Sequence, residues 1–119
     1  MTSAASRLRV AERDGITCVE FIDRNILDEA NIQRIGEEIG QLIDAQPQPR
    51  LLISFQNVDH LSSAALGTLI TINNKIKSKD GQLRLADIDP QIYEIFVITK
   101  LNKLFKIYKT SEEAIESFA

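Results

Sequence analysis

The sequence predicts an α/β fold in which helices pack against a mostly parallel central sheet. Short apolar, β-branched runs alternate along the chain with longer segments of helical periodicity, the order that is typical of parallel strands joined by helices. A hairpin signal, Asp14-Gly15, lies between the first two apolar runs, so we expect that pair of strands to be antiparallel. The predicted element order is ββαβαβαβα.

Size and composition fit one soluble domain. The chain has 119 residues, of which 44% are hydrophobic and 26% charged. Its net charge of −3 argues against a nucleic-acid partner, because such proteins usually carry a basic patch. The chain has neither the apolar core of a signal peptide nor a run of roughly 18 apolar residues that would span a membrane. We therefore expect a cytoplasmic protein that does not bind membranes.

The first half of the chain predicts a hairpin, a helix and a central strand. The hairpin strands are Leu8–Ala11 and Ile16–Phe21, and the second of them contains the lone Cys18, which we expect to be a buried structural thiol. A helix from Asp28 to Ala45 follows, with Asp28 as its N-cap. Leu51–Phe55 is a short apolar run that we interpret as a central strand buried on both faces. The inward face of the helix is expected to contain Ile32, Ile35, Ile39, Leu42 and Ile43.

The second half predicts two further strand–helix units. A helix begins at or just after Ser63 and ends before Asp80-Gly81. The next strand is Gln82–Ala86, and the last is Leu104–Ile107. Leu66, Leu69, Ile70, Asn73 and Ile76 are expected to share the inward face of the helix that follows Ser63.

Two shorter helices complete the predicted fold. Pro90 is placed at the first turn of a helix that extends to about Ile98. Thr110-Ser111-Glu112-Glu113 is a capping-box pattern that opens a terminal helix. The buried side chains of these two helices are predicted to be Ile92, Ile95, Phe96, Ala114, Ile115 and Phe118. We expect residues 1–7 to be a loose N-terminus and residues 8–119 to form the domain.

Signals of enzymatic chemistry are lacking. The sequence has neither a glycine-rich loop for phosphate nor a G-x-S-x-G nucleophile turn. His60 lies two residues before Ser62, but residues this close along the chain rarely face each other as base and nucleophile. One histidine and one cysteine do not form a usual zinc site. We predict no catalytic residue, no cofactor and no metal, and we interpret His60 as an exposed or packed side chain.

The pair Ser62-Ser63 marks the junction that we single out for function. A strand ends near Phe55, the chain crosses the carboxyl edge of the sheet, and a helix begins. This edge is where open α/β sheets meet their ligands and partners. A serine here is also a good N-cap, which is the simplest interpretation. The following residues are small, namely Ala64, Ala65 and Gly67. They leave room around a hydroxyl group, as a docking or phosphorylation site requires.

Over nearly the whole chain, from about Leu8 to Phe118, the sequence resembles the STAS domain of bacterial anti-sigma-factor antagonists. The resemblance rests on the ββαβαβαβα order and on a strand followed by V-x-x-L-S-S-x-x-L-G and an amphipathic helix. The family signature is a hydrophobic residue followed by D-S-[ST]-G-L-G, which stands here as Leu61-Ser62-Ser63-Ala64-Ala65-Leu66-Gly67. Further landmarks are Leu27-Asp28, the run from Gly81 to Leu85, the Pro90 helix and the run from Leu101 to Ile107.

The resemblance implies a regulated partner switch. The phosphorylated serine of the family falls on Ser63, and the preceding aspartate falls on Ser62, which is a departure. The second hydroxyl residue falls on Ala64 and the first glycine on Ala65. Family members bind a serine-kinase anti-sigma factor when unphosphorylated, lose it on phosphorylation by that kinase, and are restored by a serine phosphatase. The same function is therefore expected here, with Ser63 as the acceptor.

Two other functions stay open. The loss of the aspartate at Ser62 favours an unphosphorylated STAS scaffold or interaction domain within a larger assembly, and weak homo-oligomers fit that alternative. A small enzyme or nucleotide-binding α/β domain is disfavoured by the lack of a glycine loop, metal ligands or a triad.

The partner surface is expected at one edge of the sheet. Loops that follow adjacent strands come together there, so the loop at Asn25–Asp28 should lie beside the stretch Ser62–Gly67. On the helix that follows, we expect Leu66 to point inward and Thr68 and Asn74 to point outward. The predicted contact residues are Asn25, Asp28, Ser62, Ser63, Ala64, Ala65, Gly67, Thr68 and Asn74.

Overall fold

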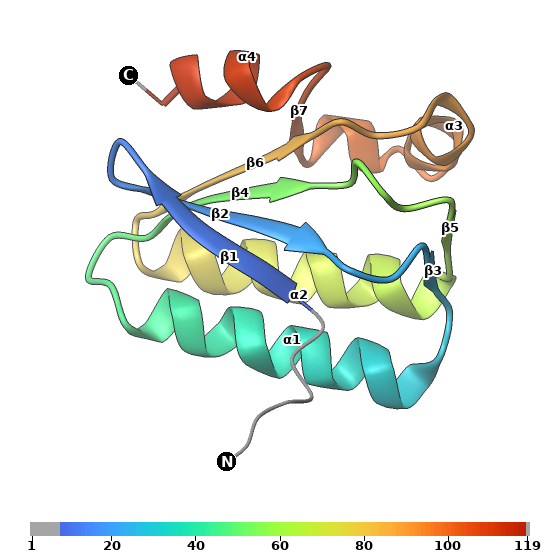
Figure 1. The fold of residues 1–119 in the computed structure, drawn as a ribbon, viewed down its shortest axis with the longest axis horizontal. Helices are drawn as coiled ribbons and strands as arrows, with labels where there is room; N and C mark the ends of the chain where they lie inside the picture. The colour runs from blue at the N-terminus through green and yellow to red at the C-terminus, as the bar shows by residue number, and fades with distance from the viewer. Residues whose placement is uncertain (1–7, 119) are drawn as a thin grey trace.

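In the computed structural model, which describes residues 8–118, helices cover both faces of a five-stranded sheet (Figure 1). Its strand order is β1-β2-β4-β6-β7. Strands β1 (Leu8–Arg13) and β2 (Ile16–Phe21) are antiparallel. Strands β2, β4 (Arg50–Ser54), β6 (Gln82–Ala86) and β7 (Lys106–Tyr108) are parallel neighbours. The predicted fold class is confirmed, whereas the expectation of a loose segment at residues 1–7 lies outside the described residues.

The turn between β1 and β2 is the hairpin that the sequence predicts at Asp14-Gly15. Arg13 pairs with Ile16, which leaves a two-residue loop. Both loop residues have positive φ, 54° at Asp14 and 79° at Gly15. Two consecutive positive φ values define the type I′ turn, whose twist matches that of the strands it joins, and Asp-Gly is a preferred sequence for it.

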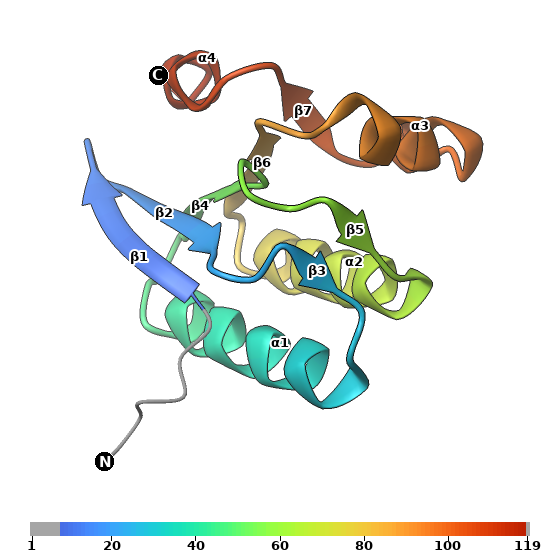
Figure 2. The same cartoon turned by 45° about the vertical axis from the view of Figure 1, so that its right-hand side comes forward.

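Two long helices lie on one face of the sheet and shorter ones elsewhere. Helices α1 (Glu29–Asp44) and α2 (Ser63–Ser78) pack side by side against one face. Helix α4 (Ser111–Glu116) covers part of the opposite face, as Figure 1 shows. Helix α3 (Pro90–Ile98) lies near the carboxyl ends of the strands, where Figure 2 brings it forward, and the short 3-10 helix Leu101–Lys103 follows it.

Side-chain caps begin the predicted helices. Asp28 accepts a hydrogen bond from the Asn31 amide of α1 at 3.0 Å. Thr110 accepts one from the Glu113 amide of α4 at 3.1 Å. Each cap satisfies one of the amide groups that a helix start leaves without a partner inside the helix. The predicted starts of these two helices are confirmed.

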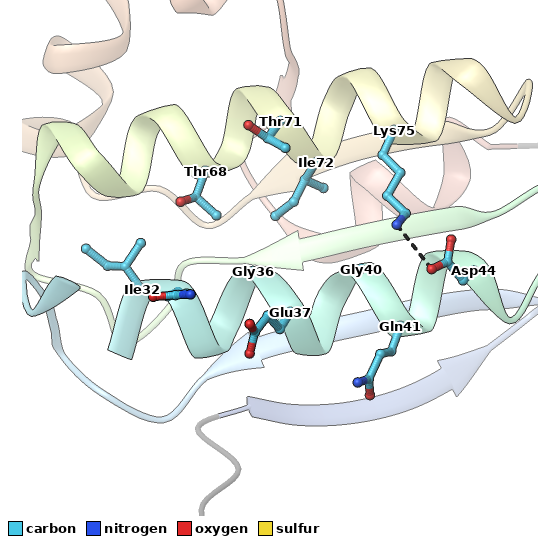
Figure 3. A pocket seen from close by; sticks show the side chains of 11 residues that line it. Ile32, Gly36, Glu37, Gly40, Gln41, Asp44, Thr68, Thr71, Ile72 and Lys75 are labelled. Carbon is cyan, nitrogen blue, oxygen red and sulfur yellow. Dashed lines mark hydrogen bonds and ion pairs between the residues drawn. The ribbon is translucent and has the colours of Figure 1, made fainter. Parts of the chain in front are cut away.

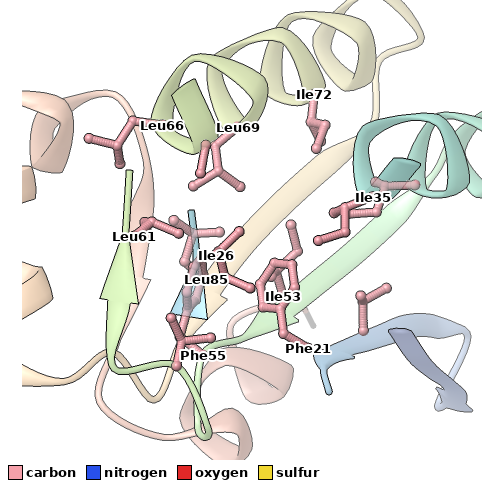
Figure 4. Close-up of a cluster of buried hydrophobic side chains, with 14 of the residues drawn as sticks. Phe21, Ile26, Ile35, Ile53, Phe55, Leu61, Leu66, Leu69, Ile72 and Leu85 are labelled. Atoms are coloured by element: carbon pink, nitrogen blue, oxygen red, sulfur yellow. The ribbon is translucent and has the colours of Figure 1, made fainter. Parts of the chain in front are cut away.

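The main hydrophobic core lies between the sheet and the helices α1 and α2. Strand β4 is buried on both faces, with Leu52 facing α4 and Ile53 facing the main core. Figure 4 shows the core side chains converging from both helices, from β3 and β5, and from the sheet. Phe55 contacts Phe21 at a ring-centroid distance of 5.3 Å and Phe96 at 6.5 Å, which ties α3 to the end of β4. The α1 residues buried in this core are Ile32, Ile35, Ile39 and Ile43.

The structure differs from the sequence-based expectations in three local features. The last strand begins at Lys106 and not at Leu104, because Phe105 turns into the core before the chain becomes extended. On α2, Ile72 is buried although it was not expected on the inward face, because α2 packs against α1 as well as the sheet. Ile70 is half-buried and packs against the main core. Two short strands were not expected at all. They are β3 (Asn25–Ile26) and β5 (His60–Leu61), which form a separate parallel pair.

Cys18 is only half-buried, contrary to the expectation of a buried thiol. It lies on the sheet face that α4 covers, and α4 has only six residues, too few to cover that face completely. Partial burial raises the pKa of the Cys18 thiol, because removal from water disfavours the thiolate. The thiol also donates a weak hydrogen bond to the carbonyl of Ile16 at 3.8 Å.

At two glycines, the structure predicts that one added methyl group has opposite effects on the free energy of unfolding. A Cβ at Gly81 would lie 2.4 Å from the carbonyl oxygen of Pro49, whereas a Cβ at Gly67, exposed on α2, would meet nothing within 4 Å. We expect Gly81→Ala to lower the free energy of unfolding by more than about 1 kcal/mol through overpacking. Gly67→Ala should raise it by about 0.5–1 kcal/mol, because alanine favours the helix interior. Urea denaturation measures both, and equal effects of the two substitutions would contradict this packing.

Candidate functional site

The two serines at the start of α2 have different environments. Ser62 is the N-cap, and its hydroxyl accepts a hydrogen bond from the Ala65 amide at 3.2 Å. Ser63 is the first helical residue and is exposed. Among residues 8–118, no group forms a hydrogen bond with the Ser63 hydroxyl. One hydroxyl therefore holds the helix start, and the other points into solvent without a structural role.

The small sheet of β3 and β5 positions this site. Asn25 pairs with His60 and Ile26 with Leu61, and the Ser62 amide donates to the Ile26 carbonyl at 3.1 Å. Figure 2 shows both strands next to the start of α2. The loop that contains Asn25 and Asp28 thus lies beside the serine pair, as the topology argument predicts.

Polar contacts beside the serines join the same two segments. Arg24 and Asp59 form an exposed ion pair at 2.8 Å. Nδ1 of His60 and Oδ1 of Asn25 are 2.8 Å apart, so the imidazole contacts an amide and not a serine. His60 is exposed, which is one of the two placements expected for it. Asn31 donates to Asp23 at 2.9 Å, which joins the first turn of α1 to the end of β2.

Helices α1 and α2 both begin at this edge and run away from it together (Figure 1). A helix start carries a partial positive charge and unpaired amide groups, which favours an anionic group there. At α1 the anionic group is the carboxylate of Asp28. At α2 the cap is the uncharged Ser62, so this start can accept a negative charge.

Among residues 8–118, no three side chains of the metal-binding types gather closely enough to hold a metal ion.

The remaining predicted contact residues divide into exposed and packed positions. Ala64, Gly67 and Asn74 are exposed. The expectation that Ala65 borders an open surface is wrong, because its side chain is 4% exposed and packs in the main core. Leu66 is buried, as expected.

Thr68 does not point freely outward, contrary to expectation, but lines a groove between α1 and α2 (Figure 3). Its methyl group lies 3.1 Å from where a Cβ on Gly36 would stand, so the glycine lets the two helices approach. The groove has a volume of about 790 Å³, and the ion pair of Lys75 with Asp44, at 3.1 Å, lies across it. Gly36, in the middle of a predicted helix, was the sequence signal for this close approach.

Comparison with known proteins identifies the family to which this fold belongs. A model of the STAS domain family matches residues 7–114. The chain belongs to the STAS domain family. A putative anti-sigma factor antagonist, BtrV of Bordetella bronchiseptica, is 23% identical over 114 residues, 94% of each chain. This name describes a regulatory role. No helix among residues 8–118 of this STAS domain is long and apolar enough to cross a membrane.

Solved structures show the same fold. An anti-sigma-factor antagonist (STAS) domain protein from Planctomyces limnophilus has a TM-score of 0.86 and 21% identity, with 98% of this chain and 100% of that chain covered. The Bacillus cell fate determinant SpoIIAA in its phosphorylated form has a TM-score of 0.69 and 15% identity, with 94% and 99% covered. The fold of this STAS domain is thus retained across chains that share few residues.

Because the two serines have different environments, we expect their substitution by alanine to affect stability differently. In this STAS domain Ser62→Ala should lower the free energy of unfolding by about 1 kcal/mol, because the helix loses its cap. Ser63→Ala should change it by less than about 0.5 kcal/mol, since the hydroxyl has no partner. Urea denaturation gives both values, and Ser62→Asp, which keeps an oxygen acceptor at the cap, is the control that should remain folded and stable. A larger loss at Ser63 than at Ser62 would reverse the assignment of the cap.

Proposed function

We propose that this STAS domain is an anti-sigma factor antagonist that binds a serine-kinase anti-sigma factor and is controlled by phosphorylation of Ser63. In the unphosphorylated form it holds the kinase and releases a sigma factor. Phosphorylation of Ser63 by the kinase ends the complex, and a serine phosphatase restores it. The protein would carry out this exchange in the cytoplasm.

The observation that carries the proposal is the hydroxyl of Ser63, which is exposed and has no hydrogen-bond partner among the described residues. A kinase needs an oxygen that can reach the γ-phosphorus of ATP as the bond to ADP breaks, while the hydroxyl proton passes to a base. Ser62 is a poor acceptor by comparison, since its oxygen holds the Ala65 amide. The relatives named as anti-sigma factor antagonists support the general role.

An exposed stripe along α2 extends from the acceptor. Ser63, Gly67 and Asn74 are exposed, and Ile70 between them is half-buried. Their spacing of four, three and four residues places them on one face of the helix. Gly67 lets a partner approach the helix backbone closely. This stripe and the neighbouring Asn25–Asp28 loop form the docking surface of the proposal.

A phosphate on Ser63 would act on the partner and not on the fold. It adds about −1.5 to −2 charges and three acceptor oxygens. At the first residue of α2 the helix dipole favours this charge by typically 0.3–1 kcal/mol. The phosphorylated domain should therefore stay folded, and the complex would be lost through charge and bulk at the interface.

One observation favours a scaffold that is not switched by phosphorylation. Ser62 provides a neutral cap where the family signature has an aspartate, so the acceptor lacks an adjacent carboxylate. The nearby carboxylate of Asp59 is engaged with Arg24. In this alternative the same surface binds a partner continuously, within a larger assembly, and labelling of Ser63 is absent.

Labelling with ATP tests the acceptor. We expect the anti-sigma-factor serine kinases of the source genome, tried in turn with ATP, to add one phosphate, which mass spectrometry places on Ser63. Ser63→Ala should abolish the label, and Ser62→Ala should keep most of it, because the hydroxyl of Ser63 remains. The Ser62 variant is compared at a temperature where circular dichroism shows it folded.

Label that persists on Ser62 in the Ser63→Ala protein would overturn the assignment. If no kinase labels the wild-type protein while one of them still binds it, the scaffold becomes the better function.

Binding of the kinase tests the stripe on α2. We expect Asn74→Arg to weaken the complex at least about tenfold, or about 1.4 kcal/mol, because a bulky charge would stand within the interface. Gly67→Ala should weaken it too while stabilising the fold. Gln48→Arg is the matched control, since Gln48 is an exposed neutral residue in the loop before β4. Calorimetry measures the affinities of the three variants for the kinase. If Asn74→Arg and Gly67→Ala bind the kinase as tightly as the Gln48→Arg control does, the interface lies elsewhere.

A further inference from the structure

An open sheet edge lies next to helix α3. Strand β7 is the last strand of the sheet, so one of its two sides has no neighbouring strand among the described residues. Its other side pairs in parallel with β6, and no backbone hydrogen bond joins residues 106–109 to any other described segment. Figure 2 shows this edge at the far side of the sheet from β1, with α3 beside it. The outer amide and carbonyl groups of β7 can therefore pair with a further strand.

The segment that contains this strand is basic, although the chain has 17 acidic and 14 basic residues. A lysine occurs at every third position with no acidic residue between, at Lys100, Lys103, Lys106 and Lys109. All are exposed, and none forms an ion pair within the part of the chain that the structure describes. Lys106 is the first residue of β7 and Lys109 follows its last residue, so these two lie at either end of the open edge. A surface of one sign of charge attracts partners of the other sign.

An apolar hollow of about 420 Å³ lies at the same edge. It is formed by the end of β7, the chain that leads into α3 and the first turn of α3, and its lining consists of Ile88, Pro90, Tyr93, Ile107, Tyr108 and Lys109. Tyr93 is 40% exposed, although tyrosine rings usually pack against other groups. No carboxylate of the described residues lines the hollow, and the nearby Asp89 is engaged as the cap of α3. A hollow of this size has room for an apolar side chain of a partner.

Lysines on a short strand also protect a sheet edge against unwanted pairing. Protection alone explains the charge but not the hollow, because exposed apolar surface beside an open edge favours association. A second copy of β7 would bring the lysines of both chains to one short edge, and like charges across a strand pair are destabilising. Strand β1, at the other edge of the sheet, has two arginines and one glutamate, so it is disfavoured on the same ground. The charge therefore selects an acidic strand that this sheet does not itself supply.

We propose that the β7 edge binds an extended acidic segment of a partner protein as an additional strand. Main-chain hydrogen bonds would hold the segment, and its alternate side chains would be read on the two faces of the sheet. Lys106 pairs with Arg84, whose contacts with Ser117 and Phe118 place both on the face that α4 covers. Ile107, the next residue, therefore lies on the other face, where it lines the hollow.

This alternation defines the sequence that the edge recognises. Residues directly opposite each other on paired strands share a face of the sheet. An acidic side chain opposite Lys106 would thus lie on the face of the ammonium group, and the adjacent side chain, opposite Ile107, would enter the hollow next to Tyr93. The recognised segment alternates acidic and apolar residues. The proposal does not depend on phosphorylation of Ser63.

A synthetic peptide in which glutamate alternates with isoleucine, with both ends blocked, tests the site on the whole protein. We expect saturable binding by calorimetry and slower amide hydrogen exchange between Lys106 and Lys109, because an outer amide of β7 gains an acceptor. The same peptide with lysine in place of glutamate should not bind. Absence of binding by the acidic peptide, or slower exchange along β1 and not along β7, would overturn the proposal.

Backbone methylation of the peptide separates strand pairing from attraction by charge. One peptide carries N-methyl groups on its glutamates and another on its isoleucines, so each lacks the donors of one edge. Since only one edge of the peptide pairs with β7, one of the two should bind at least about tenfold more weakly than the unmethylated peptide. Equal affinity of all three peptides would contradict strand addition.

Variants of exposed residues locate the binding. Lys106→Gln with Lys109→Gln should weaken peptide binding at least about tenfold. The matched control, Arg9→Gln with Arg13→Gln, removes the same charge from the β1 edge and should leave the affinity unchanged. Tyr93→Ala should also weaken binding about tenfold through loss of the hollow's aromatic wall, whereas Tyr93→Phe should retain it. If the lysine variant binds the peptide as tightly as the arginine variant does, the site lies elsewhere and the proposal fails.

Vesicles test the other partner that lysines beside apolar groups attract, an anionic membrane surface. We expect vesicles of phosphatidylserine to sediment the protein no more than vesicles of phosphatidylcholine do, because a lipid surface offers no main-chain groups to a strand edge. Sedimentation by phosphatidylserine alone, lost in the Lys106→Gln, Lys109→Gln protein and without binding of the acidic peptide, would replace the peptide by a membrane and overturn the proposal.

Discussion

Burial of β4 on both faces is the constraint on which the rest of the structure depends. Leu51, Leu52 and Ile53 are each at most 1% exposed, so this strand needs helices on one face and α4 on the other. Parallel neighbours β2 and β6 supply its hydrogen bonds on either side. Parallel strands require crossover connections, and each crossover returns the chain to the same starting edge. The segments that follow the parallel strands therefore begin at the carboxyl edge, and the serine pair lies there too.

At that edge the hydroxyl groups of the two serines have different environments. The Ser62 hydroxyl caps α2 through the Ala65 amide, and Ala65 itself is anchored in the core. This arrangement defines the helix start and turns the next side chain, Ser63, away from the protein. A neutral cap keeps the helix start able to accept a charge. The same geometry would suit the proposed phosphoacceptor, because the Ser63 hydroxyl has no partner among the described residues on which stability depends.

The two ends of α2 differ in the groups that they present. The carboxyl edge presents small side chains and an exposed hydroxyl, which suits a macromolecule. Near the far end, Asn73 is buried, and its amide nitrogen has no hydrogen-bond partner among the described residues. Because α2 is one helix of 16 residues packed against α1 and the sheet, its two ends share a scaffold while remaining separate.

The sequence by itself determined the fold class, the Asp14-Gly15 turn, the caps at Asp28 and Thr110, and the serine pair at the start of a helix. These features rest on local periodicity and on hydrogen bonds within a few residues, which leave a direct pattern in the sequence. Only the tertiary structure decided which serine is the cap, that β3 pairs with β5, that Ala65 and Ile72 are buried, and that Thr68 faces α1. It also placed the buried Arg84 of β6 over the ring of Phe118 near the chain end. These outcomes depend on contacts between segments far apart in the chain, such as the packing of α2 against α1, and a single sequence records no distance between them.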